Sequence, residues 1–196
     1  MLDKLIALDT TIFLWLNSFH SPVWDKIMWH ISGKLEWIPF YLVLAGYFIY
    51  RYHWRSIVIF IAMGIAISLA DQLSVIAFKE TIHRLRPTHN PEIKELVHIV
   101  QDYRGGLYGF ISNHAANSFA LAIFSSLLVK KKYFSLAIIL WASLVSYSRI
   151  YLGVHYPGDI IGGAFFGCLI GWSIYFLYNK IIDLIPPLKK GKAVNG

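Results

Sequence analysis

The stretch "SIVIFIAMGIAISLADQLSVIAF", Ser56 to Phe78, contains a single charged residue, Asp71. A surface helix of a soluble protein carries a polar face, and Ile57–Ala70 provides none. A helix needs about 20 consecutive, mainly apolar residues to cross a bilayer, and this stretch is long enough. It therefore predicts a membrane-spanning helix.

Four further apolar runs follow the same pattern, at residues 35–50, 112–129, 133–148 and 159–178. Of the whole chain, 57% is hydrophobic and only 15% is charged, which is more apolar than an average soluble domain. Some runs are shorter than the roughly 20 residues of a full crossing, so flanking residues must contribute. A soluble protein with buried helices is disfavoured, because Leu136–Val145 also lacks a polar face. We predict an all-α, polytopic membrane helix bundle with about five transmembrane helices, spanning residues 35–178.

Residues 1–34 and 179–196 flank this predicted bundle. The first segment mixes apolar and polar residues at helical spacing, is broken at "HSP" (His20–Pro22) and is rich in tryptophan. Tryptophan favours the membrane–water interface, so we expect two amphipathic helices lying on the membrane. The alternative is that Leu5–Phe19 forms a short extra span. The last segment, from Asn179, predicts a polar tail. A single cysteine, Cys168, excludes an intrachain disulfide.

The alternation of spans brings distant parts of the chain to one membrane face. The second predicted span ends at Phe78, before a long polar loop, residues 79–111, that leads into the third span. The fourth and fifth spans meet on the same side, in the stretch "SRIYLGVHYPGD" (Ser148–Asp159). The polar residues that we expect to gather at this face are Lys79, Arg86, His114, Arg149, His155 and Asp159.

Two features inside the spans concern packing. Asp71 lies about two helical turns before Lys79, and acids within a membrane usually face a partner, so we expect Asp71 to support Lys79 or to join helices. Gly163, Gly167 and Gly171 are spaced four residues apart and share one face of a helix. Such a face allows another helix backbone to approach closely.

The charge distribution predicts an orientation. The short connections that carry Arg51, Arg55 and Lys130–Lys132 are basic, whereas most acidic residues lie on the side of the long loop. Basic short loops face the cytoplasm. We therefore expect a multi-pass protein of the cell's inner membrane, with the polar residues on the extracytoplasmic side.

The gathered cations predict an anion site. Arginine forks match pairs of phosphate oxygens and lysine adds a point charge, so Lys79, Arg86 and Arg149 suit a phosphate group. Ser112 and Asn113 stand where a helix begins, and the free N–H groups of a helix start bind anions. We predict these five residues to bind substrate.

The histidines predict the reaction. Asp159 follows His155 by four residues and can hold one imidazole nitrogen, which leaves the other free to attack phosphorus. His114 can then protonate the expelled alkoxide. His155, His114 and Asp159 are therefore the predicted catalytic residues. We expect neither metal nor cofactor, because three neighbouring cations would oppose a metal ion.

These residues resemble a three-part signature. The three parts are Lys79, six residues, then Arg86-Pro87; Ser112-Asn113-His114; and Ser148-Arg149, five residues, His155, three residues, Asp159. They are similar to the motifs of the type-2 phosphatidic acid phosphatase superfamily. The resemblance covers about residues 71–171. It implies a nucleophilic third-motif histidine, an orienting aspartate and an acid in the second motif. The second motif departs from the usual Pro-Ser-Gly-His, because Ile111 and Asn113 replace the proline and the glycine.

The resemblance implies an integral membrane lipid phosphatase that works through a phospho-histidine intermediate. Its short N-terminal part looks like that of small undecaprenyl-diphosphate phosphatases, which makes undecaprenyl diphosphate the first expectation. Phosphatidylglycerophosphate, phosphatidate and a lipid A phosphate are the alternatives. A protein that only binds or transports lipid phosphates is an alternative of another class, disfavoured because binding needs neither an acid nor a nucleophile. The expected partner is a lipid phosphate in the membrane and not a nucleic acid, and the sequence does not indicate an oligomeric state.

Overall fold

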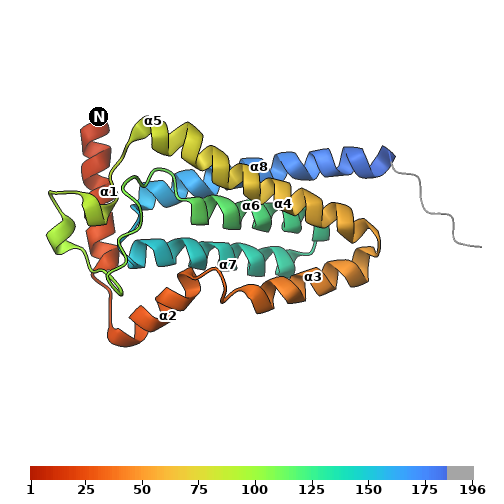
Figure 1. The fold of residues 1–196 in the computed structure, drawn as a ribbon, viewed down its shortest axis with the longest axis horizontal. Helices are drawn as coiled ribbons and strands as arrows, with labels where there is room; N and C mark the ends of the chain where they lie inside the picture. Colours follow the sequence, from red (N-terminus) through yellow and green to blue (C-terminus); the bar gives the residue numbers. More distant parts are fainter. Residues whose placement is uncertain (185–196) are drawn as a thin grey trace, which may run out of the picture.

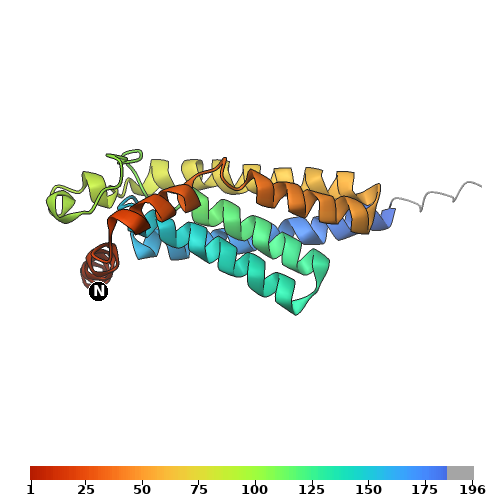
Figure 2. The same cartoon turned by 90° about the horizontal axis from the view of Figure 1, so that it is seen from below.

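The computed structural model describes residues 1–184, and this part is helical with connecting loops. Five long helices lie side by side along the long axis of the molecule (Figures 1 and 2). They are α3 (Ile38–Tyr52), α4 (Arg55–Ser74), α6 (Asn113–Val129), α7 (Lys132–Tyr151) and α8 (Pro157–Leu184). The all-α bundle predicted from the sequence is therefore confirmed.

Three of these helices are long and apolar enough to cross a membrane by themselves: Arg55–Ile82, Lys132–Tyr151 and Pro157–Leu184. The other two, α3 and α6, have 15 and 17 residues and are shorter than a full crossing. The count of about five transmembrane helices therefore stays a prediction, although all five helices lie along the same axis of the bundle (Figure 2).

The second predicted span is longer than the sequence suggested. From α4 the chain continues through a π-helical turn, Val75–Lys79, into the short helix α5 (Glu80–Ile82). The polar loop thus begins at His83 and not at Lys79, because nothing before His83 interrupts the helix. His83 itself has a left-handed backbone, with φ of 51°, which ends it.

The last helix also exceeds its prediction. Instead of ending at 178, α8 continues to Leu184, because Ile182 still packs into the same buried cluster as Ile174 and Tyr178. Residues 179–184 are therefore helix and not polar tail. The remainder of the predicted tail, residues 185–196, lies outside the described residues.

The glycine face of α8 packs directly against α6. A Cβ atom added at Gly163, Gly167 or Gly171 would lie 2.5, 2.2 or 2.4 Å from a backbone oxygen of α6 or its cap. The backbone N–H of Ser112 also donates to the carbonyl oxygen of Asp159 at 3.0 Å. This close approach sets the start of α6, with His114, beside the start of α8, with Asp159.

The N-terminal segment forms two helices, α1 (Leu2–Asn17) and α2 (Pro22–Ser32), broken where the sequence predicted. Figure 1 shows α1 lying across one end of the bundle. Asn17 is buried there and donates to the carbonyl oxygens of Ile150 and Tyr151 at 3.3 and 2.8 Å. Phe13 packs edge-on against Tyr156. Both helices therefore cover the end of the bundle where α7 and α8 meet; their position in the membrane interface stays a prediction.

The loop between α5 and α6 folds over the same end of the bundle. It contains two 3₁₀ turns, Pro87–His89 and Lys94–Leu96, and an isolated antiparallel bridge between Leu85 and Tyr108. This loop, α1 and α2 enclose the ends of α4, α6, α7 and α8.

Candidate active site

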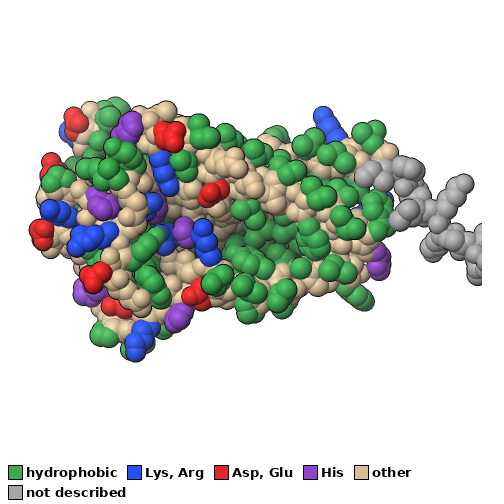
Figure 3. Space-filling view, in the orientation of Figure 1, with side chains coloured by type: hydrophobic (Ala, Val, Ile, Leu, Met, Phe, Trp, Pro, Cys, Tyr) green, Lys and Arg blue, Asp and Glu red, His purple; other side chains and the backbone are tan. Residues whose placement is uncertain are grey.

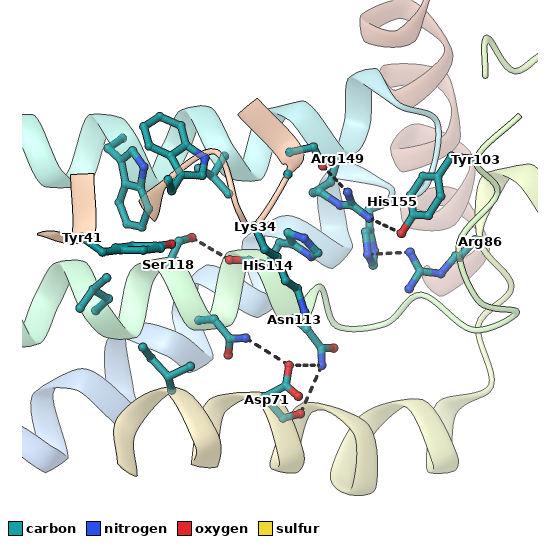
Figure 4. A pocket seen from close by; sticks show the side chains of 18 of the residues that line it. Lys34, Tyr41, Asp71, Arg86, Tyr103, Asn113, His114, Ser118, Arg149 and His155 are labelled. Carbon is teal, nitrogen blue, oxygen red and sulfur yellow. Dashed lines mark hydrogen bonds between the residues drawn. The ribbon is translucent and has the colours of Figure 1, made fainter. Parts of the chain in front are cut away.

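A cavity of about 570 Å³ opens at this end of the bundle (Figure 4). The residues that line its polar part include Lys34, Lys79, Arg86, Asn113, His114, Arg149 and His155, together with Asp71. The residues that line its apolar part are Trp37, Tyr41, Ile67, Leu121, Trp141 and Val145. Figure 3 shows charged side chains gathered over this end of the molecule and hydrophobic side chains further along the hollow. The cavity is therefore amphipathic.

His155 has one defined tautomer. Its Nε2 lies 2.9 Å from Nη1 of Arg86, and a guanidinium can only donate, so Nε2 carries the lone pair. Nδ1 therefore bears the proton and donates it to Oδ2 of Asp159 at 3.2 Å. Asp159 is fully buried, and its Oδ2 also accepts from the backbone N–H of Tyr156 at 3.0 Å. The side chain of His155 is thus oriented with Nε2 toward the cavity.

The protonation state of His155 follows from its surroundings. Burial lowers its pKa well below the usual value of 6.5, and the nearby cations Arg86, Arg149 and Lys79 lower it further. The imidazole is therefore neutral at neutral pH, as a nucleophile requires.

Arg86 is buried beside His155 and is held there by the long loop and by the segment that precedes α8. Its Nε donates to the carbonyl oxygen of Tyr108 at 3.2 Å, and its Nη1 donates to that of Val154 at 3.0 Å. Burial lowers the pKa of Arg86 to about 10, with a further contribution from Arg149, so the side chain remains a cation at neutral pH. Arg86 places its charge directly in front of the nitrogen that would attack phosphorus.

Arg149, in the last turn of α7, is also buried and fixed. Its guanidinium donates to the hydroxyl oxygen of Ser32 and, at 3.1 Å, to that of Tyr103. The helix α2 and the long loop thus each supply a hydroxyl that orients one cation of the cavity. Lys79, on the π-helical turn, and Lys34, after α2, add two further cations to its wall.

Two of the three residues of the second motif line the cavity, and the third does not. The hydroxyl of Ser112 is fully buried and caps α6 by accepting from the N–H of Ala115 at 3.5 Å, and Ser112 is absent from the cavity wall. Asn113 does line the cavity, but its Nδ2 donates to Oδ1 of Asp71 at 2.8 Å. His114 contributes to the wall as expected.

Asp71 joins α4 to α6. Besides Asn113, Nδ2 of Asn117 donates to the same Oδ1 at 3.1 Å. Of the two expectations for this acid, the structure therefore shows the role in helix packing. The unusual Asn113 has a structural partner that a glycine could not have.

Sequence reasoning missed four contributors to this site. Arg84, in the long loop, donates from Nη1 to Oδ1 of Asp159 at 2.9 Å. The sequence does not indicate a role at this site for Asp9, Lys34 or Tyr103, because they come from segments without a recognisable motif. Arg84 alone had a cue, its position two residues before Arg86.

Within residues 1–184, no three side chains of His, Cys, Asp or Glu come together in the way that metal ligands do. The charged groups around His155 are instead mainly cations.

A helix bundle whose cationic, amphipathic cavity contains two histidines is the arrangement expected of a membrane enzyme of phosphoryl chemistry. The PAP2 superfamily model matches residues 56–183, and the chain belongs to this superfamily. It is 42% identical over 184 residues to a lipid A 4'-phosphatase of Bacteroides thetaiotaomicron, covering 92% of this chain and 81% of the relative. It is 34% identical over 178 residues to a lipid A 4'-phosphatase of Porphyromonas gingivalis, covering 90% and 75%.

The fold agrees with this assignment. The crystal structure of a transmembrane PAP2-type phosphatidylglycerolphosphate phosphatase from Bacillus subtilis superposes with a TM-score of 0.67 at 26% identity, over 95% of this chain and 90% of that one. The protein is thus an integral membrane phosphatase that acts on lipids.

Proposed function

We propose that the enzyme removes phosphate from a phosphorylated glycolipid of the lipid A type, by way of a phospho-histidine on His155. The relatives that are 42% and 34% identical and named lipid A 4'-phosphatase support this substrate class. They favour it over the undecaprenyl diphosphate that we expected from the short N-terminal part.

The observation that carries the proposal is the order of cationic, acidic and apolar surfaces along the cavity. The cationic end, with Arg86 and Arg149, suits the phosphate, and the apolar end, with Trp37 and Trp141, suits a hydrocarbon chain. Between them, Asp71 lies in the wall with Oδ1 bonded to two amides, and among residues 1–184 no hydrogen bond reaches its Oδ2. A free carboxylate oxygen can accept from the hydroxyl groups of a sugar. The hydrocarbon chain of an isoprenyl diphosphate carries no hydroxyl groups.

The chemistry proceeds in two displacements. In the first, Nε2 of His155 attacks phosphorus, the phosphorus–oxygen bond to the lipid breaks, and His114 gives its proton to the departing alkoxide. In the second, His114 takes a proton from water, which attacks the phospho-histidine, and inorganic phosphate leaves with His155 restored. Arg86 must release Nε2 before the first step, and we expect its guanidinium to turn to the phosphate oxygens.

Asp159 and the cations support both displacements. Asp159 holds the Nδ1–H tautomer and stabilises the positive charge that develops on the ring. Arg86, Arg149 and Lys79 stabilise the negative charge on the equatorial oxygens, which is the main task in phosphoryl transfer. Because cations and not a metal ion carry this task, we expect full activity in excess chelator and inhibition by vanadate.

The test is phosphate release by the purified protein in detergent, from lipid A, undecaprenyl diphosphate, phosphatidylglycerophosphate and phosphatidate. We expect the highest kcat/KM with lipid A, with mass spectrometry showing loss of its 4'-phosphate. His155→Ala serves as the inactive control. A higher kcat/KM with undecaprenyl diphosphate would overturn the substrate class and leave the two-histidine mechanism standing.

A further inference from the structure

The orienting carboxylate of Asp159 is itself held by an ion pair with Arg84, which in turn reaches the N-terminal helix. Nη1 of Arg84 donates to Oδ1 of Asp159 at 2.9 Å, and Nη2 of Arg84 donates to Oδ2 of Asp9, in α1, at 2.6 Å. The other oxygen of Asp9 accepts from the backbone N–H of Gly158 at 2.8 Å. A continuous chain of polar contacts therefore runs from α1 to the nucleophile, through Asp9, Arg84, Asp159 and His155.

The guanidinium of Arg84 is fixed from a third side. It lies over the ring of Tyr156, with 4.0 Å between its central carbon and the ring centroid. The side chains of Arg84 and Asp9 are only 22% and 17% exposed, so solvent screens this pair weakly. The position of Arg84 is thus determined by both α1 and the chain segment that precedes α8.

The two oxygens of Asp159 have separate tasks. Oδ2 holds His155 and the backbone of Tyr156, and Oδ1 is bound by Arg84. Among the described residues, Arg84 is the one cation that hydrogen-bonds to this fully buried carboxylate. Other charged groups near the pair, Arg86 and Lys79, face the cavity side of His155. A buried carboxylate without its partner is costly to keep ionised.

We propose that Arg84 and Asp9 are positioning residues for the phosphatase reaction, which act on His155 through Asp159. Arg84 keeps Asp159 ionised and turned so that Oδ2 accepts the Nδ1 proton of His155. Asp9 holds Arg84 in this position and anchors α1 to the start of α8. The helix α1 is thereby part of the catalytic geometry and not only a membrane-surface element. This inference rests on the proposed role of His155 as nucleophile.

The test compares Arg84→Gln, Arg84→Lys and Asp9→Asn with the wild type in detergent, measuring kcat, KM and thermal unfolding. We expect Arg84→Gln to lower kcat by about 10- to 100-fold, by analogy with the loss on removing the outer partner of a metal-ligating side chain, with KM nearly unchanged. Arg84→Lys should restore part of kcat, because it restores the charge. Asp9→Asn should lower kcat less, because Arg84 keeps its contacts with Asp159 and Tyr156.

A double variant separates positioning from a general structural effect. If Arg84 acts through Asp159, then Arg84→Gln should cause almost no further loss of kcat in an Asp159→Asn background. An equal loss in both backgrounds, or a rise in KM at unchanged kcat, would overturn the proposal.

The matched control is Arg104→Gln, an exposed arginine of the same loop, which should leave kcat unchanged. If His155→Ala keeps its turnover, the proposed mechanism fails. If His155→Ala is inactive but Arg84→Gln leaves kcat unchanged, the mechanism stands and only the positioning role of Arg84 is wrong.

Discussion

At the residue scale, the two histidines of the cavity have different surroundings. We therefore expect their replacement by alanine to have different effects on the reaction rate. His155 is oriented by Asp159, whereas His114 lies in the open cavity wall. A general acid matters most when the leaving group is a poor alkoxide. We therefore expect His114→Ala to lose about 10²- to 10⁴-fold in rate with a lipid phosphate and much less with nitrophenyl phosphate. His155→Ala should lose both activities. The measurement is kcat for both substrates, and covalent phosphate trapped on His114 would reverse the assignment.

The environment of His155 also predicts a pH dependence. Burial and then the cations Arg86, Arg149 and Lys79 lower its pKa, so the neutral, nucleophilic form is lost only on acidification below the usual value of 6.5. We expect the acid limb of kcat/KM, which reports the free enzyme, to lie below pH 6.5. In Lys79→Met the limb should move to higher pH, because one of these cations is gone. A wild-type limb at or above pH 6.5 would contradict this reading of the site.

At the element scale, the geometry of the proposed active site depends on the contact between α6 and α8. A Cβ at Gly167 would lie 2.2 Å from the backbone oxygen of Ala116, so Gly167→Ala must push the two helices apart. Overpacking of this kind costs about 1–3 kcal/mol, and the shift also separates His114 from the start of α8. We expect a lower Tm and a lower kcat. Gly64 is the matched control on α4, with no atom within 4 Å of an added Cβ, and Gly64→Ala should change neither quantity appreciably.

At the scale of the whole molecule, the bundle has a site end and a basic end. The connection between α3 and α4, next to Arg55, and the connection with Lys130 and Lys131 lie at the end away from α1 and α2 (Figure 1). We expect this basic end to face the cytoplasm. In a Cys168→Ser background, a cysteine in place of Glu95 should react with an impermeant thiol reagent on intact cells. A cysteine in place of Lys131 should react only after lysis, and the opposite pattern would invert the topology.

Much of this molecule follows from local sequence. A long apolar run that lies in a membrane forms a helix, because the backbone has no water there and must satisfy its own hydrogen bonds. Counting these helices was enough to place Lys79, His114 and His155 at one end. The four-residue spacing of the α8 glycines was likewise enough to predict a close helix contact, since spacing along a helix determines which face a residue occupies.

Other features were decided only by the tertiary structure. The sequence carries no sign that Arg84 bonds both Asp159 and Asp9, each 75 positions away. It also could not show that the side chain of Ser112 caps α6 away from the cavity wall, or that Asn113 pairs with Asp71. The physical reason is the distance along the chain over which each kind of interaction acts. Apolar runs and helical spacing act over a few turns of one segment, whereas a hydrogen bond or an ion pair forms only between atoms about 3 Å apart. Which distant side chains reach that distance is determined by how the loop, α1 and α8 pack together.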